Sequence, residues 1–210
     1  MNAYESFYLP EAKSHLGTCT DYLINRCGIA ADRVGGIYAT SPLMKAFGRG
    51  EPAIVSGISG IELGQRLYRA LYGREDAPEW TGDRNGRSCE YWGGWALAHF
   101  QWHWNRPFKW IFARTRFSDI LAKYSVYHEM DVSRFLEDFM REIQSVPVEP
   151  NLRRLRRAAG CSQAELARSG VNIRNIQLYE QRVQDINRAS AESLARLAQC
   201  LSCSIEDLMD

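Results

Sequence analysis

Apolar residues recur every three or four positions along most of the chain, the spacing that places side chains on one face of an α-helix. Residues 190–201 show this most clearly, because Leu194, Leu197, Ala198 and Leu201 fall on a single stripe. No segment of convincing length alternates apolar and polar residues as a half-buried β-strand does. The pattern therefore predicts an all-α fold.

Capping residues indicate where these helices begin in the first two thirds of the chain. Ser59, Ser88, Ser118 and Asp131 each precede an apolar-periodic segment, and we expect their side chains to accept hydrogen bonds from the first turn. A further helix is expected to start at Pro107. The four capped helices are expected at about residues 60–72, 89–104, 119–124 and 132–144, and an earlier helix at about 9–26.

Glycine and proline mark the irregular segments between these helices. Residues 28–57 are rich in both, with Gly35–Gly36 among them, so short helices interrupted by turns are expected there. Residues 73–88 are polar and are expected to form an exposed loop. The two prolines Pro147 and Pro150 break helices on both sides and predict a domain boundary. We therefore expect an all-helical interaction or sensing domain at 1–146 and a second domain at 147–210.

Residues 162–182 carry the most informative local pattern in the second domain. Ser162 and Glu165 have the spacing of a capping box, and Gly170 stands where a sharp turn favours a positive φ. Asn172 can cap the next helix, which turns Ile176 and a tyrosine three residues later toward the core. The outer side of that helix then presents Ile173, Arg174, Asn175, Gln177 and Leu178 to a groove. With helices at about 151–159 and 190–201 and a final turn after Ser204, this makes a compact five-helix domain.

Composition and charge agree with a soluble protein that has one basic segment. The net charge is +1, and residues 1–147 hold 17 basic and 17 acidic side chains, but residues 148–190 hold eight arginines against four acids. Arginine suits bidentate contacts to phosphate and guanine. No apolar run approaches the roughly 18–20 residues of a membrane span, and the first residues lack the order of a signal peptide. We expect a cytoplasmic protein without membrane association.

Residues 151–210, under a third of the chain, resemble the Xre/Cro-like helix-turn-helix family of DNA-binding repressors. The resemblance implies a λ-repressor-like domain that binds double-stranded DNA through its third helix in the major groove. Its motifs are Leu152-x-x-Leu155-Arg, Ser162-Gln-x-Glu-Leu-Ala167, Gly170-Val171, Ile176-x-x-Tyr179-Glu180 and Leu194-x-x-Leu197-Ala…Leu201.

The resemblance also assigns expected DNA contacts to individual residues. Gln163 would contact the backbone and base edges, whereas Arg174, Asn175 and Gln177, beside Ile173, would reach into the groove. Arg can fork onto guanine, and Asn or Gln onto adenine. Arg182 and Arg188 are expected to hold phosphates.

Two departures from the family pattern have physical consequences. The second helix is one residue short between Ala167 and Gly170, so its last turn must tighten or the helices must reorient. Arg182 stands where the family has glycine, and a non-glycine residue in a left-handed conformation costs roughly 1 kcal/mol. Both departures are expected to weaken DNA binding.

Aromatic residues gather in the first domain, where all six tryptophans lie between Trp80 and Trp110. On a helix, Trp92, Trp95, His99 and Trp102 form one stripe, and Gly93–Gly94 leaves a flat patch for another backbone. The stripe fits either a buried core or an exposed aromatic groove for a protein or a small ligand. Residues 90–102 are also similar to helical domains that precede this helix-turn-helix in bacterial antitoxins.

Candidate metal and catalytic residues are few. His99 and His103 have a zinc-binding spacing, but the glutamate of a zinc-protease helix is missing, and a third ligand would have to come from His128 or Glu129. Cys200-x-x-Cys203 is half of a zinc site without a second pair. We therefore expect no metal, no cofactor and no enzymatic activity.

The sequence thus predicts a bacterial, sequence-specific DNA-binding transcription regulator, a repressor or autoregulator that binds paired half-sites as a homodimer. The alternative is an antitoxin-type interaction module, in which the first domain neutralises a toxin and DNA binding is secondary. A third hypothesis, an enzyme in the first half, depends on His99 and His103 alone.

Overall fold

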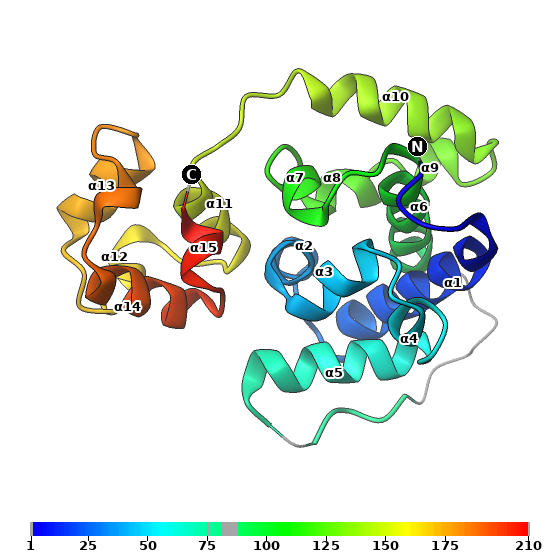
Figure 1. Ribbon diagram of the computed structural model, residues 1–210, viewed down its shortest axis with the longest axis horizontal. Helices are drawn as coiled ribbons and strands as arrows, with labels where there is room; N and C mark the ends of the chain where they lie inside the picture. The colour runs from blue at the N-terminus through cyan, green and yellow to red at the C-terminus, as the bar shows by residue number, and fades with distance from the viewer. Residues whose placement is uncertain (1, 75, 81–87, 210) are drawn as a thin grey trace. The chain divides into compact units, whose positions relative to one another are not determined.

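The computed structural model describes residues 2–74, 76–80 and 88–209, and it divides into two compact units, Met1–Val146 and Pro147–Asp210. The described residues form helices and contain no β-strand (Figure 1). The prediction of an all-α fold is therefore confirmed. Among the described helices, none combines the length and apolar character needed to cross a bilayer.

The centre of the first unit is a pair of helices, α1 (Leu9–Asp21) and α6 (Cys89–Trp104), which lie side by side. Gly94 makes this approach possible, because a Cβ there would collide with the Leu16 carbonyl and the Thr20 side chain. Another backbone thus approaches the expected flat patch at Gly94, whereas the Leu121 and Phe117 side chains pack against Gly93. The helix α6 is buried on several sides, through Ala96, Leu97, Ala98, Phe100 and Gln101.

Further helices surround this pair, and several large aromatic side chains among them are fully buried. The expected helix at 9–26 is α1 continued by a π-helical turn, and residues 28–57 do form short helices. The surrounding elements are η1 (Ser6–Tyr8), η2 (Tyr22–Arg26), α2 (Ala31–Thr40), α3 (Pro42–Gly48), α4 (Pro52–Val55), α5 (Gly60–Tyr72), α7 (Phe108–Phe112), α8 (Phe117–Leu121), α9 (Tyr124–Tyr127) and α10 (Val132–Gln144).

Three of the four predicted caps are confirmed, since Ser59, Ser88 and Asp131 accept hydrogen bonds from the first turns of α5, α6 and α10. The prediction for Ser118 was wrong. Here α8 begins at Phe117, because the Asp119 carboxylate accepts a hydrogen bond from the Arg116 backbone N–H at 3.1 Å and so fixes the start earlier. The expected helix at 119–124 is split between α8 and α9.

The structure corrects the expectation of a turn at Gly35–Gly36, and it describes only part of the expected loop at 73–88. Gly35–Gly36 lies inside α2 instead of a turn, and a Cβ on Gly35 would stand 3.0 Å from the Phe112 ring, so the glycine permits close helix packing. In the expected loop at 73–88, Trp80 packs partly buried against the core. Residues 75 and 81–87 lie outside the described part of the chain.

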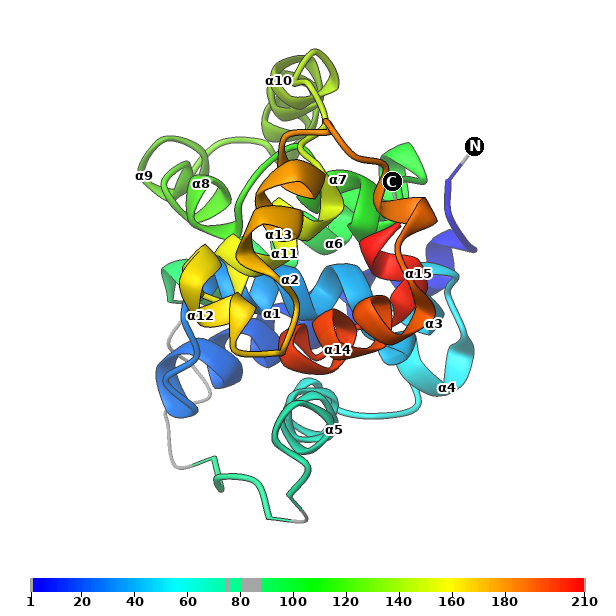
Figure 2. The same ribbon diagram turned by 90° about the vertical axis from the view of Figure 1, so that its left-hand side faces the viewer.

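The second unit contains the five predicted helices and one short 3-10 turn. They are α11 (Asn151–Ala158), α12 (Gln163–Ala167), α13 (Ile173–Glu180), η3 (Ile186–Arg188), α14 (Ala191–Leu201) and α15 (Ile205–Leu208). Figure 2 shows α12 and α13 of this unit facing the viewer. One apolar core holds them together, built from Leu152, Leu155, Leu166, Val171, Ile176, Tyr179, Ile186, Leu194, Leu197, Ala198, Leu201 and Leu208.

Candidate nucleic-acid interface

The helix α12 begins with the capping box that the sequence predicts. The Glu165 backbone N–H donates to Ser162 Oγ at 3.1 Å, and the Ser162 N–H donates to the Glu165 carboxylate at 2.7 Å. The hydrogen bonds that the Glu165 carboxylate accepts from Ser162 lower the pKa of Glu165, because they favour its charged form. The start of α12 is therefore fixed by local chemistry, and Leu166 is buried beneath it.

The end of α12 shows how the expected shortening of this helix would be accommodated. The backbone N–H groups of Arg168, Ser169 and Gly170 donate to the carbonyls three residues earlier, at 3.0–3.1 Å. Such bonds belong to a 3-10 helix, which turns more tightly than an α-helix. Of the two expected accommodations, the last turn of α12 therefore tightens.

Gly170 makes the turn between α12 and α13 with a φ of +91°. Its carbonyl accepts a hydrogen bond from Arg196 Nη1 at 3.3 Å, and a Cβ at this position would lie 2.6 Å from that nitrogen. Arg196 is held in place by Glu192, 2.5 Å away on the same helix. The backbone conformation thus favours glycine here, and any larger residue would also force the Arg196 head group to shift.

The helix α13 presents the predicted outer residues on the side away from its core contacts. Asn172 caps it by accepting the Arg174 N–H at 2.8 Å. Ile176 and Tyr179 point into the core, whereas Ile173 and Arg174 are exposed. The other three outer residues, Asn175, Gln177 and Leu178, are half-buried.

A buried carboxylate connects three elements of this unit. Glu180, at the end of α13 and 4% exposed, accepts Arg156 Nε at 2.6 Å and Arg156 Nη2 at 2.9 Å. Gln163 Nε2 donates to the same carboxylate at 2.8 Å, and Arg156 Nη1 donates to the Cys161 carbonyl. The ion pair raises the pKa of Arg156. The orientation of α13 relative to α11 and α12 is therefore set by charged hydrogen bonds as well as by apolar packing.

Residues 151–210 match the family model described as the Cro/C1-type helix-turn-helix DNA-binding domain. This segment is a Cro/C1-type helix-turn-helix domain. Comparisons of the chain with curated proteins and with solved structures gave no match. The identification thus covers the second unit, and it supports DNA binding by this domain.

Among the predicted DNA contacts of the Cro/C1-type domain, Gln163 has its side chain hydrogen-bonded to the buried Glu180 carboxylate. Gln163 is half-buried at the first position of α12, where its amide N–H₂ is engaged with Glu180. Sequence reasoning assigned no role to Glu180 or Arg156, although an acid at the end of the third helix and an arginine-rich first helix were visible. Contact between Gln163 and DNA stays a prediction.

Arg182 and Arg188 lie beyond the C-terminal end of α13 in the Cro/C1-type domain. Arg182 is exposed and has a φ of +54°, so the left-handed conformation expected from the missing glycine is confirmed. Arg188 ends η3, with its side chain 88% exposed and 3.8 Å from Asp185. Both positions are compatible with the predicted phosphate contacts.

The predicted aromatic stripe outside the Cro/C1-type domain divides into a buried part and an accessible part. Trp102 was wrongly included in a binding surface, because it is 8% exposed and its Nε1 donates to the Tyr4 carbonyl at 2.8 Å. His99 lies between the rings of Trp95 and Trp102. Trp92 and Trp95 are half-buried and line a pocket.

The two candidate zinc sites find no third ligand within the described residues, which contain no group of three or more His, Cys, Asp or Glu able to hold a metal ion. The Nδ1 atom of His99 is buried, and it has no hydrogen-bond partner among the described residues. Burial, with the nearby charge of Lys13, lowers the pKa of His99 to about 4.

Proposed function

We propose that the protein is a sequence-specific DNA-binding transcription regulator, a repressor or autoregulator acting in the bacterial cytoplasm. The observation that supports this best is the fixed orientation of α13. Its buried face is held by the core and by Glu180, while Ile173 and Arg174 stay exposed. A helix presented in this way can enter a major groove without rearrangement of the domain.

In the proposed complex, α13 reads bases and the residues after it hold the backbone. Arg174 donates two hydrogen bonds to a guanine, and Asn175 or Gln177 pairs with an adenine. Arg182 and Arg188 contact phosphates and position the domain without reading sequence. A repressor of this kind acts by occupying DNA that the transcription machinery needs.

We propose that the active form is a homodimer. One helix-turn-helix domain contacts only a few base pairs, and a second copy on a half-site about 34 Å away doubles the sequence that is read. The dimer would therefore select a pseudo-palindromic operator.

The proposal is tested by selecting duplexes from a random library with the full chain and measuring their affinity at two salt concentrations. An Arg174→Ala/Gln177→Ala variant is expected to lose about tenfold or more in affinity for the selected sequence. Arg141→Ala/Gln144→Ala is the matched control, because it removes the same residue types at the same spacing from exposed positions of α10. No selected sequence, or an equal loss in both variants, would refute the proposal.

An antitoxin-type interaction module remains the second candidate, with DNA binding as autoregulation. Exposed apolar side chains on the first unit favour it, with Val126 53% and Met130 51% exposed. A toxin-like reading frame beside the gene, and co-purification of its product with the full chain, would support this candidate. Neutralisation unchanged by Val126→Ser/Met130→Ser would remove the structural reason for it.

A further inference from the structure

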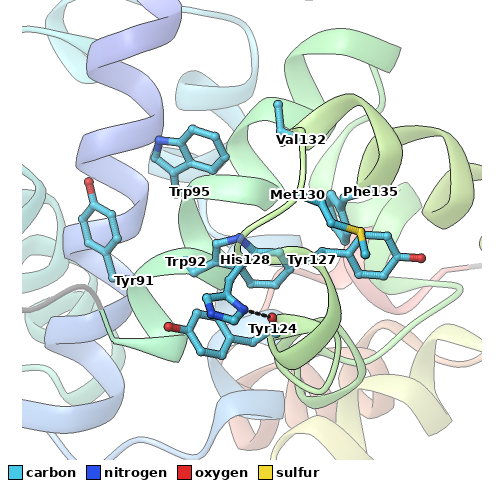
Figure 3. A pocket seen from close by; sticks show the side chains of 9 residues that line it. All are labelled: Tyr91, Trp92, Trp95, Tyr124, Tyr127, His128, Met130, Val132 and Phe135. Carbon is cyan, nitrogen blue, oxygen red and sulfur yellow. Dashed lines mark hydrogen bonds between the residues drawn. The ribbon is translucent and has the colours of Figure 1, made fainter.

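A pocket of about 330 Å³ opens in the first unit between α6, α9 and the start of α10. Its volume lies in the range of small-molecule sites. Figure 3 shows Tyr91 and Trp95 on one side of Trp92, and Tyr127 and Phe135 on the other. The lining is completed by Tyr124, His128, Met130 and Val132.

Aromatic rings dominate the wall of this pocket. The Trp92 ring is edge-on to Tyr124, with centroids 5.7 Å apart, and edge-on to Phe135 at 5.4 Å. Trp92 is only half-buried, although its neighbour Phe135 is 1% exposed. The face of an aromatic ring carries partial negative charge and attracts cations. The pocket therefore offers an apolar surface on which exposed ring faces carry partial negative charge.

The charges around the pocket are unevenly distributed. Its described lining includes His128 but no lysine or arginine. Glu129 and Asp131 are outside the lining, although they stand between the lining residues 128, 130 and 132 along the chain. Glu129 has an 86% exposed side chain, 3.5 Å from His128. A third carboxylate, Asp138, accepts a hydrogen bond from the Tyr127 hydroxyl at 3.2 Å.

The nearby basic side chains do not reverse this asymmetry. Arg134 lies 3.1 Å from Asp138, and Lys123 pairs with Glu142 at 2.6 Å. The Lys13 ammonium lies 4.4 Å from the centre of the Trp95 ring. This contact shows that the aromatic surface accepts a cation, and it also makes the Trp95 edge the less favourable end for a second one.

We propose that this pocket binds a small organic cation with an apolar body, such as a quaternary ammonium compound. The positive centre lies against Trp92 and Tyr124, at the end where His128, stacked on Tyr124 with ring centroids 4.3 Å apart, pairs with Glu129. The apolar body packs on Phe135 and its neighbours. The proposal deepens the proposed function, since it names the chemical class of the regulator's effector. Regulation by the cation depends on the protein being a DNA-binding regulator, whereas binding of the cation in the pocket does not.

The position of the pocket in the chain gives the ligand a route to influence the DNA-binding unit. Val132 and Phe135 belong to the first turn of α10, and Asp131 caps that helix. The other end of α10, at Gln144, stands two residues before the end of the first unit at Val146. A ligand that fixes the start of α10 thus acts on the last helix before the linker.

The first test titrates the full chain with benzyltrimethylammonium while tryptophan fluorescence and binding heat are recorded. Phenylmethanesulfonate is the anionic counterpart, and neopentylbenzene is the neutral carbon isostere. We expect saturable binding of the ammonium compound at least several-fold tighter than of either control. Absence of binding, or equal binding of the sulfonate, would overturn the proposal.

Charge variants locate the site without disturbing the fold. Glu129→Gln/Asp131→Asn removes two charges, and asparagine retains the cap of α10. We expect a roughly two- to tenfold loss of affinity for the ammonium compound, with binding of neopentylbenzene unchanged. Glu51→Gln/Glu62→Gln is the matched control, because Glu51 precedes α4 and Glu62 lies in the first turn of α5, both outside the pocket lining. An equal loss in the control would show that only overall charge matters and would refute the assigned site.

Ring variants test the aromatic contact itself. Tyr124→Phe keeps the ring face and is expected to bind the ammonium compound as the parent does, whereas Tyr124→Leu is expected to lose several-fold. Equal affinities in the two variants would contradict the proposed contact. Sedimentation with and without benzyltrimethylammonium adds a check. If the compound bound only to the monomer, a second copy would cover the pocket in the dimer, and the compound could not be an effector of the dimeric regulator.

The same preparations are assayed for DNA binding, so that the two proposals fail separately. Cation binding without sequence-selective DNA binding would refute the regulator and leave the pocket assignment intact. Selective DNA binding without cation binding would do the reverse. A shift in DNA affinity on adding benzyltrimethylammonium, absent in Glu129→Gln/Asp131→Asn, would connect the two.

Discussion

Arg156 forms a two-point ion pair with Glu180, through Nε at 2.6 Å and Nη2 at 2.9 Å, and this pair joins the first helix of the DNA-binding domain to the end of its third. The side chains are 12% and 3% exposed. Breaking such a pair on one side leaves a buried charge without its partner, which is more costly than the pair itself is stabilising.

Arg156→Ala is therefore expected to destabilise the second unit by about 3–5 kcal/mol. Hydrogen exchange of the full chain, read separately on peptides of α11–α13, measures this locally. Arg153→Ala is the control, because Arg153 makes a surface pair with Glu149 at 3.6 Å and should change stability by under about 1 kcal/mol. Equal protection in the two variants would contradict the structural role of the pair.

Substitution of Gly170 tests the helix-helix turn. Gly170→Ala combines an unfavourable φ of +91° with a Cβ 2.6 Å from Arg196 Nη1, so we expect a loss of more than about 1 kcal/mol from the second unit. Gly160→Ala is a matched control, since Gly160 has a φ of +70° and its Cβ would meet no described atom within 4 Å. Thermal unfolding followed by circular dichroism should show a larger loss for Gly170→Ala, and Arg196→Ala should partly rescue it.

Local chemistry made the second unit predictable from the sequence. Caps and turns depend on residues a few positions apart, so Ser162, Glu165, Gly170 and Asn172 could be placed from their spacing alone. Ser118 shows the limit of this reasoning. The carboxylate of the next residue, Asp119, accepts a hydrogen bond from the Arg116 backbone N–H, so α8 begins at Phe117 and not after Ser118.

Long-range packing explains what the sequence could not predict. The burial of Trp102 depends on the Tyr4 carbonyl, 98 residues away along the chain. The aromatic pocket forms because Trp92 meets Tyr124 and Phe135 from other helices. Periodicity identified the aromatic stripe on α6, but which of its members stay accessible is decided by the elements that pack on it.

His99 predicts a pH dependence of the stability of the first unit. Its pKa is about 4 in the folded protein, because burial disfavours the charged ring, against an ordinary value of 6.5. Between these values the unfolded chain binds more protons, so stability is greatest above pH 6.5 and is lost as the pH falls toward 4. Neighbouring charges act in both directions, since Lys13 and His103 lower this pKa and Asp131 raises it.

His99→Phe should remove this part of the pH dependence. It should also raise stability at neutral pH, because the variant lacks the buried Nδ1 that has no partner among the described residues. The comparison requires thermal midpoints from pH 4 to 7, with His128→Gln at an exposed position as the control, because His128 does not contribute to the pKa shift of His99. A parental profile in His99→Phe would assign the pH dependence to other groups.

Arg182 predicts opposite changes in stability and DNA affinity. A φ of +54° costs about 1 kcal/mol for a residue that has a Cβ, and glycine avoids this cost. Arg182→Gly should therefore stabilise the second unit by roughly that amount. The same substitution removes a proposed phosphate contact, so affinity should fall alike for selected and unrelated duplexes, and the salt dependence should weaken by about one charge. Arg182→Lys is the control, because it retains both the charge and the strain. If Arg182→Gly lost affinity only for the selected sequence, Arg182 would be reading bases, and its assignment to the phosphate backbone would be wrong.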